Sequence, residues 1–442
     1  MFYFDDVQLG EPKAEVRRKR AIRHNSVLVD DEMSNGPFSY KKLGIDLLLV
    51  VDNTVYEHFY ASVKGDEYAA VHGIHDYYSS VLFELARIYS SKRLGKMQFK
   101  IYPVGIFIAK TAADSPWAKL PINRTTTLNG RLSVDAFEAL RAFRRWVKEE
   151  IENLPKHDHA MSFTRMDISR FGDNKAQGIA YVKSICRDGE SVSLVEDVGA
   201  MATVAIAGHE LAHSLGAEHD GTENSSICLP HHNYLMVPSV SASRDTLPNT
   251  FTFSECTIEQ IRRHVIGHPS RASCLYHSNL AEVGYKSIDS VGQDAHPGPG
   301  LTIDVNQQCQ RTFGLTFRFC GENDYYLKQM CRQLWCRNVT LGRRSSCYTK
   351  PYLPALSGTT CGHKMLCRNA ACIYDERAAP LQQSCKFGDR DSNFCWKLVT
   401  TDSTRCKVPT FQRFCCQTCK EMQSRRKRRR LRHHNNRKGR NP

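Results

Sequence analysis

The chain has 442 residues, too many for one small domain, and its 41% hydrophobic and 24% charged content is ordinary for folded globular protein. No stretch is apolar over a sufficient length to cross a bilayer, so we expect no membrane span within these residues. The formal net charge is +15, and residues 420–442 carry eleven Lys and Arg against one Glu, so the rest of the chain is only mildly basic.

Residues 1–20 do not have the pattern of a secretory signal peptide. They end in the basic run RRKR (residues 17–20), which resembles a furin-type processing site. We therefore interpret residues 1–20 as the end of a propeptide whose upstream part, with a signal sequence, would precede this sequence. An ordinary solvated basic run is the alternative.

Strand and helix patterns alternate from about residue 41 to residue 276. The apolar run at residues 44–52 predicts a buried strand, and residues 97–109 and 160–163 are further strand candidates. Helical periodicity covers residues 69–91 and 133–151.

A third helix is predicted from residue 198 to residue 215, and it carries the sequence HELAHSLGAEHD (residues 209–220). His209 and His213 are four residues apart, so they lie on one helix face and can bind one metal ion. Gly216 permits a sharp exit from the helix, which would bring His219 round as a third ligand. Three protein nitrogens with an open fourth position are typical of a catalytic zinc site.

Glu210 is the candidate catalytic residue of this motif. With Zn²⁺ polarising the substrate carbonyl and activating a water, Glu210 would accept the proton of that water and pass it to the leaving amine. The sequence therefore predicts peptide-bond hydrolysis without an acyl-enzyme. A helix that simply carries core histidines is the alternative.

The sequence HNYLMVP (residues 232–238) follows the histidines, and with it the chain resembles the metzincins, whose Met-turn is matched by Met236. Asp220, directly after the third histidine, is similar to the adamalysin (reprolysin) branch. This resemblance implies an α/β metzincin catalytic domain, residues 21–277, with a mixed, mostly parallel sheet and long helices. It assigns structural roles to Met236, Gly216 and Asp220.

The same resemblance implies disulfide pairs and a second metal. It pairs Cys186 with Cys274 and Cys228 with Cys256, although spacing alone allows three connectivities of these four cysteines. Asp46 and Asp158 match acidic ligands of a structural Ca²⁺ site. The expected acidic or amide residue after the last cysteine is His277, so a capping or solvated role for both aspartates is the alternative. We expect His157, His159, His231 and His232 to be structural or surface residues.

The 18 cysteines fall into groups of four, eight and six along the chain, which indicates three disulfide-stapled modules folded in an oxidising compartment. Glycosylation sequons at Asn123, Asn224 and Asn338 are compatible with secretion. A Gly- and Pro-containing linker (residues 278–300) precedes small disulfide-rich modules. Residues 301–376 resemble the disintegrin-like domain of the ADAMTS family, and residues 377–419 resemble its PLAC domain.

The basic tail, residues 420–442, is expected to be disordered and to attract polyanions. We favour sulfated glycosaminoglycans over nucleic acid, because the disulfide framework argues against a nuclear compartment. A second processing site and a solubilising tail are the alternatives.

Together these observations predict a secreted zinc endopeptidase that acts on extracellular or matrix proteins. The alternative function is a non-catalytic matrix- or glycosaminoglycan-binding protein on a protease-like scaffold. A latent enzyme held inactive by its own prosegment is a further possibility.

Overall fold

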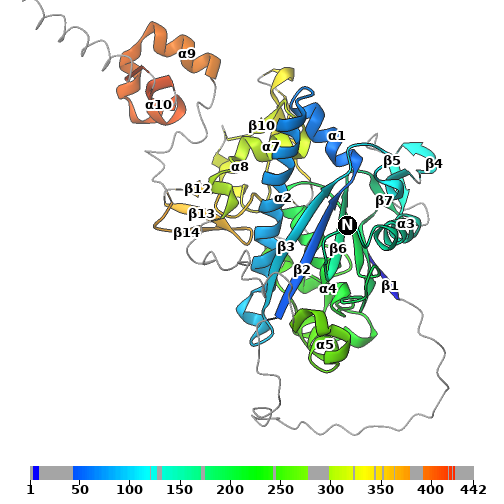
Figure 1. The fold of residues 1–442 in the computed structure, drawn as a ribbon. Coiled ribbons are helices and arrows are strands. Elements are labelled where there is room, and N and C mark those ends of the chain that lie inside the picture. Colours follow the sequence, from blue (N-terminus) through cyan, green and yellow to red (C-terminus); the bar gives the residue numbers. More distant parts are fainter. Residues whose placement is uncertain are drawn as a thin grey trace, which may run out of the picture. The chain divides into compact units, whose positions relative to one another are not determined.

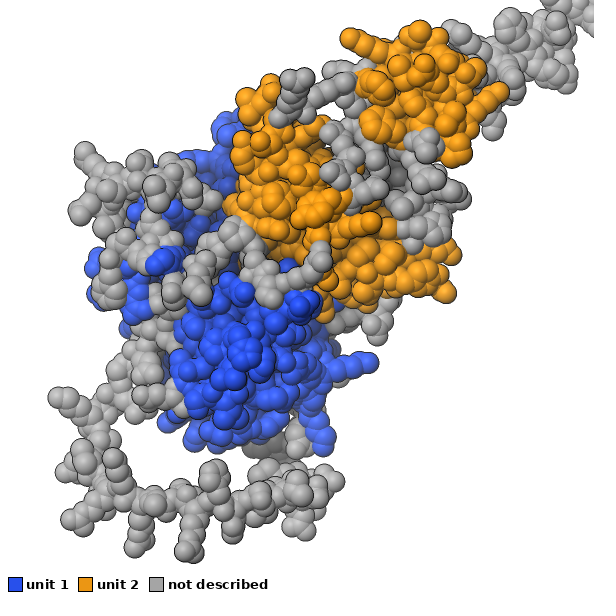
Figure 2. All heavy atoms as spheres, turned by 180° about the vertical axis from the view of Figure 1, so that it is seen from behind, with its two compact units in different colours: residues 1–198, 203–295 blue, residues 199–202, 296–442 orange. Residues whose placement is uncertain are grey.

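A computed structural model describes residues 3–8, 43–119, 121–126, 132–170, 175–241, 245–276, 298–321, 324–342, 345–350, 353–362, 364–378, 392–416, 418–420 and 422–423. The chain divides into two compact units, residues 1–198 with 203–295 and residues 199–202 with 296–442 (Figure 2). The expected processing site at residues 17–20, the linker residues 278–297 and the tail residues 424–442 lie outside the described residues.

The first unit alternates strands and helices, as the sequence pattern predicts (Figure 1). Its strands are β1 (Tyr3–Gln8), β2 (Leu43–Val51), β3 (Phe99–Ile108), β4 (Pro121–Thr126), β5 (Leu132–Asp135), β6 (His159–Thr164), β7 (Asp167–Ser169), β8 (Ala176–Val182) and β9 (Val192–Glu196). Its α-helices are α1 (Asn53–Ser62), α2 (Glu67–Tyr89), α3 (Ala136–Glu149), α4 (Ala200–Ser214) and α5 (Glu255–Val265). Short 3-10 turns link these elements, at Lys92–Leu94, Pro116–Lys119, Glu223–Ser225, Pro230–His232, Leu247–Phe251 and Pro269–Tyr276.

The main sheet has six strands in the order β1-β8-β9-β6-β2-β3. All neighbours are parallel except β8 and β9, which are antiparallel. Strand β2 lies between β6 and β3 and is buried along its whole length, which explains its unbroken apolar sequence. The expected mixed, mostly parallel sheet is thereby confirmed, and the strand predicted at residues 44–52 corresponds to β2.

Helices cover both faces of this sheet. On one face, α3 packs Leu140, Phe143 and Val147 into a core with side chains of β2, β6, β8 and β9. On the other face, the Tyr78 ring of α2 lies 4.6 Å from the Phe163 ring of β6. The hydroxyl of Tyr89, at the end of α2, donates to the carbonyl of Gly208 in α4 at 2.7 Å. This contact ties α4 to the long helix α2.

Helix boundaries follow capping side chains that the periodicity analysis did not use. Asp135 accepts the N–H of Glu138 and so begins α3 at Ala136. The three preceding residues, which we predicted as helix, instead belong to β5. They pair with β7 in a small sheet of order β4-β5-β7, and this tertiary pairing outweighs local propensity.

The second unit is built from short elements and disulfides. Four bridges join residues 309–372, namely Cys309–Cys336, Cys320–Cys347, Cys331–Cys367 and Cys361–Cys372. Its elements up to residue 374 are η8 (Pro299–Leu301), α7 (Val305–Phe313), β10 (Phe317–Phe319), α8 (Asp324–Gln329), β11 (Cys336–Asn338), η9 (Val339–Leu341), β12 (Thr360–Gly362), β13 (Met365–Arg368) and β14 (Ala371–Tyr374).

The C-terminal helices have a core of their own. They are α9 (Ser392–Thr401), η11 (Ser403–Lys407) and α10 (Pro409–Phe414), stapled by Cys395–Cys415 and Cys406–Cys419. Val399 is buried among these cysteines. A disulfide-rich C-terminal region is therefore confirmed. Across the described part of the chain, no helix combines the length and apolarity that a membrane crossing requires.

Candidate metal centre

Three histidine side chains converge in the first unit. The Nε2 atom of His209 lies 2.9 Å from that of His213 and 3.0 Å from that of His219. His209 and His213 are fully buried and His219 is nearly so. Nitrogen ligands of a tetrahedral zinc ion stand roughly 3.3 Å apart. The three rings therefore fit one zinc ion with only a slight expansion.

Backbone carbonyls orient the two helix histidines. The Nδ1 atom of His209 lies 2.7 Å from the carbonyl oxygen of Leu235, and that of His213 lies 2.8 Å from the carbonyl of Ala217. Since Nδ1 must carry the proton in these contacts, each Nε2 presents a lone pair to the centre. Burial, followed by the neighbouring His213 and His219, holds the pKa of His209 well below its usual value, which favours the neutral form that binds metal.

Gly216 makes the turn that returns the third histidine. Its φ is +105°, and a Cβ there would lie 2.7 Å from the Cβ of His264 on α5. Both the backbone conformation and the close packing therefore require glycine. The amide of Gly216 closes α4 by donating to the carbonyl of His213 at 2.9 Å.

The segment around Met236 holds this loop by its backbone. Met236 is fully buried, and its carbonyl accepts the N–H of Asp220 at 2.8 Å. Its neighbour Leu235 supplies the carbonyl that contacts His209. Two successive residues therefore support the first histidine and the aspartate at the end of the motif. Asp220 in turn accepts the hydroxyl of Ser254 at 2.6 Å. Burial raises the pKa of Asp220 from 3.8 to about 6.

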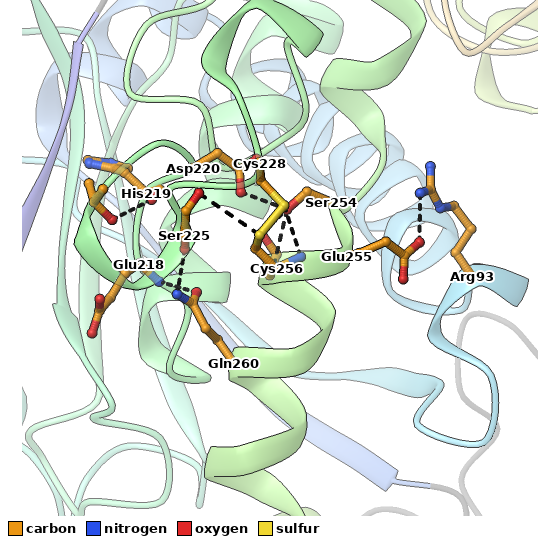
Figure 3. Close-up of a disulfide and its surroundings, with 12 residues drawn as sticks. Arg93, Glu218, His219, Asp220, Ser225, Cys228, Ser254, Glu255, Cys256 and Gln260 are labelled. Atoms are coloured by element: carbon orange, nitrogen blue, oxygen red, sulfur yellow. Dashed lines mark hydrogen bonds and ion pairs between the residues drawn. A yellow bond between two sulfur atoms is a disulfide. The ribbon is translucent and has the colours of Figure 1, made fainter. Parts of the chain in front are cut away.

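The Cys228–Cys256 disulfide and α5 clamp the same loop (Figure 3). Ser254 caps α5 and also donates to Asp220, while Gln260 of α5 accepts the N–H of Glu218 at 2.9 Å. The second bridge of this unit joins Cys186 to Cys274. Both are the pairs that the family resemblance implied.

Glu210 lies against the sheet at β8. It is fully buried, and a Cβ built on Gly178 of β8 would overlap its carboxylate. Only glycine at position 178 therefore leaves room for this side chain in its observed place. Strand β8 thus borders the candidate catalytic group.

The other histidines lie away from the three-histidine cluster. His159 is fully buried between the hydroxyls of Ser191 and Ser193, at 2.9 and 2.8 Å, and burial lowers its pKa to about 3. His157 contacts the carbonyl of Pro155, and His231 and His232 are exposed. None of the four joins the cluster in the described residues, in line with the structural or surface roles expected of them.

The structure brings Asp46 and Asp158 together. The N–H of Asp46 donates to the Asp158 carboxylate at 2.8 Å, and burial, together with the charges of Asp46 and Asp188, raises the pKa of Asp158 to about 7. Calcium prefers six to eight oxygen ligands, and the expected third position, His277, lies outside the described residues. Calcium binding at this pair stays a prediction.

Two of the three sequons can be placed. Asn224 is exposed, and the Oδ1 atom of Asn338 accepts from the N–H and hydroxyl of Thr340 in its own sequon. Asn123 belongs to β4, and its side chain lies outside the described residues. Glycosylation stays a prediction at all three.

Comparison with known families agrees with this geometry. Residues 128–278 match the reprolysin (M12B) family of zinc metalloproteases, and residues 299–373 match the ADAMTS cysteine-rich domain 2. In these two regions the chain is similar to the ADAMTS proteins. The reprolysin match supports a zinc metalloprotease, and the three-histidine cluster is a group that could hold the metal ion.

Individual ADAMTS relatives match about half of the chain or more. The human "A disintegrin and metalloproteinase with thrombospondin motifs 18" is 30% identical over 241 residues, which cover 54% of this chain and 18% of that protein. The human "A disintegrin and metalloproteinase with thrombospondin motifs 16" is 29% identical over 55% of this chain and 18% of its own length. An ADAMTS-like protein of Bombyx mori is 29% identical over 64% of this chain and 39% of its own length. The ADAMTS-like chain thus matches less than half the length of each of these relatives.

One solved chain, titled "Structure of a chaperone-substrate complex", is 19% identical with a TM-score of 0.25, and the match covers 41% of this chain and 25% of that one. An overlap this loose supports no conclusion.

The motif analysis missed three supporting residues. Leu235 acts through its carbonyl, Gly178 through the absence of a side chain, and Ser254 through its bond to Asp220. The expected floor residue Met236 lies next to the first of these. A serine preceding α5 is a visible capping signal, but its bond to Asp220 spans 34 positions.

Proposed function

We propose that this ADAMTS-like protein is a secreted zinc-dependent endopeptidase that hydrolyses peptide bonds of extracellular or matrix proteins. The observation that carries the proposal is the convergence of three buried histidine Nε2 atoms. Glu210, the residue after the first of these histidines, is fully buried as well. The reprolysin-family match supports the same reaction class.

His209, His213 and His219 would hold the zinc ion in this mechanism. A bound zinc ion supplies a Lewis acid that polarises a carbonyl and acidifies water. Glu210 removes the proton from the attacking water and later delivers it to the leaving amine. Gly178 leaves the space in which that carboxylate stays, and Leu235 keeps His209 in the orientation that exposes Nε2.

The decisive experiment removes the general base while leaving the metal ligands in place. Zinc-loaded full-length Glu210→Ala is expected to lose at least about 10³-fold in cleavage of a panel of extracellular-matrix proteins. Its zinc content should be unchanged by elemental analysis. A chelator should abolish wild-type cleavage, and the control Glu218→Ala alters a partly buried neighbour of His219. Cleavage that survives Glu210→Ala would contradict the proposal, and a folded, zinc-loaded wild type without activity would favour the non-catalytic binding scaffold.

A latent form of the same enzyme is the second candidate, because one observation favours it. Residues 3–8 form β1, which pairs in parallel with β8, and position 3 lies opposite Ala176. This is the strand whose Gly178 borders Glu210. An extended substrate that needs the free edge of β8 would compete with β1. We therefore propose that residues 1–20 are a retained prosegment that restrains activity until cleavage after residue 20.

The remaining assignments are proposals of the same kind. We take residues 377–419 as a PLAC-like module and residues 420–442 as a polyanion-binding tail. The Asp46 and Asp158 pair is the candidate for structural calcium.

A further inference from the structure

A second charged site lies on α3, on the side of the helix that faces away from the core. Arg141, Arg144, Arg145 and Lys148 follow one another at spacings of three, one and three residues, which places them on one helix face. The opposite face buries Leu140, Phe143 and Val147. We call the four cations the α3 basic groove.

The groove is hollow rather than flat. The four cations, together with Glu149 and the ring of Tyr181 on β8, line a cavity of about 480 Å³. The guanidinium of Arg144 lies over the Tyr181 ring, 5.3 Å from its centre, and so covers the only aromatic lining residue. Five of the six lining residues are therefore charged.

Glu190 fixes two of the cations and leaves the other two available. Its carboxylate accepts from Lys148 at 2.8 Å and from Arg144 at 3.2 Å. The Lys148 hydrogen bond, the charge of Arg144 and the charge of Arg187 keep the pKa of Glu190 below its usual value. Arg141 and Arg145 are exposed and make no hydrogen bond or ion pair with any described residue. Cations outnumber carboxylates around the groove, so its field attracts anions.

The form of the groove selects among anionic ligands. Four cations span about 10 Å of helix at 1.5 Å per residue, which suits several anionic groups on an extended chain. Single-stranded nucleic acid needs exposed aromatic rings for base stacking, and Tyr181 is buried. A bound peptide needs apolar pockets for alternate side chains, and none of the six lining residues is aliphatic. Arginine forks pair well with sulfate and carboxylate oxygens.

We propose that the α3 basic groove binds a sulfated polysaccharide chain. This site is distinct from the basic tail and from the metal centre. Its residues pack on the α3 face of the sheet, whereas Glu210 contacts β8 at Gly178. The proposal does not depend on proteolytic activity, so either can fail without the other.

The test is binding of a defined heparin oligosaccharide to the full-length protein by titration at several salt concentrations. Arg141→Ala/Arg145→Ala is expected to weaken binding about tenfold at 0.15 M salt and to lower the salt dependence, because two anion contacts are lost. The matched control is Arg262→Ala/Arg263→Ala, which removes two exposed arginines of α5 that already pair with Glu259. The control should bind like the wild type, and all three proteins should share one Tm.

Hydrogen exchange on the same full-length protein locates the contact. Added oligosaccharide should slow exchange in residues 141–148. Protection confined to the tail, or equal losses in both double variants, would overturn the proposal. Chemically desulfated heparin, polyglutamate and single-stranded DNA are the competing probes. If any of them binds α3 as tightly as heparin, the sulfated-polysaccharide assignment is wrong.

Discussion

At the scale of single residues, the metal centre depends on groups whose importance lies in their surroundings. Leu235 contributes a carbonyl oxygen, and Gly178 contributes space. His209 and His213 could be predicted from spacing alone, because i and i+4 positions share a helix face whatever the fold. The carbonyl that orients His209 comes from 26 positions away, and no local pattern contains it.

Gly178→Ala tests whether Glu210 must stay where β8 leaves it room. The added Cβ would overlap the Glu210 carboxylate, so the side chain must move. We expect kcat to fall by about 10²-fold with little change in KM or Tm, because a displacement near 1 Å costs that much at a catalytic group. Steady-state kinetics on a peptide substrate measure kcat and KM separately.

The control for this variant is Gly105→Ala on β3, where a Cβ would make ordinary contacts at 3.4 and 3.8 Å. It should keep full activity. An active Gly178→Ala enzyme would show that the position of Glu210 in this structure is not required.

At the scale of elements, two disulfides of one unit have different tasks. Cys228–Cys256 joins the loop after His219 to α5, whereas Cys186–Cys274 joins the segment after β8 to the 3-10 turn Pro269–Tyr276. Replacing the first pair by alanine should lower the free energy of unfolding by about 3–4 kcal/mol and also weaken zinc affinity. The second pair closes a longer loop, so its loss should cost at least as much stability but less zinc affinity.

Thermal unfolding and competition with a zinc chelator measure the two quantities. The two double-alanine variants serve as controls for each other. Equal losses of zinc affinity would contradict the separate roles assigned to the two bridges.

The cap of α1 makes a pH-dependent contribution to the same unit. Asp52 is fully buried, and it accepts the hydroxyl of Thr54 at 2.7 Å and the N–H of Val55 at 3.1 Å. Burial raises its pKa from 3.8 to about 6, in spite of these hydrogen bonds and one from Thr164. A raised pKa means that the folded state binds the extra proton between these values, so the free energy of unfolding falls as pH rises from about 4 to about 6.

Asp52→Asn removes this charge and keeps a capping amide. It should raise stability relative to wild type by about 2–3 kcal/mol above pH 6 and give no such gain near pH 4. Paired thermal unfolding of both proteins at pH 4 and pH 7.5 measures the difference. The control is the same substitution at Asp66, the exposed N-cap of α2, which lies outside the core. A gain for Asp52→Asn that is equal at both pH values would show that the buried charge is not its cause.

At the scale of the whole molecule, the open question is what occupies the edge of β8. Cleavage after residue 20 should raise peptidase activity several-fold, because it releases the segment that pairs with this edge. Pro substitutions at Asp6 and Val7, tested separately, should achieve the same in the uncut chain. Only one of two adjacent strand N–H groups points at the neighbouring strand, so one variant should activate more. Kinetics before and after furin-type cleavage measure both effects.

An uncleavable variant with serine at residues 17–20 is the control, and it should stay at the basal rate. Equal activity in cut and uncut chains would refute latency while leaving the zinc chemistry untouched.

The sequence by itself determined the parts of this protein that depend on neighbours along the chain. They are the shared helix face of His209 and His213, the glycine turn before His219, the buried strand β2 and the even cysteine groups. Only the tertiary structure decided that residues 133–135 form a strand, that Gly178 makes room for Glu210 and that Glu190 orders two cations of the α3 basic groove. The physical reason is distance along the chain. Periodicity reports which residues share a face, whereas these contacts join segments tens of residues apart and exist only after the sheet has assembled.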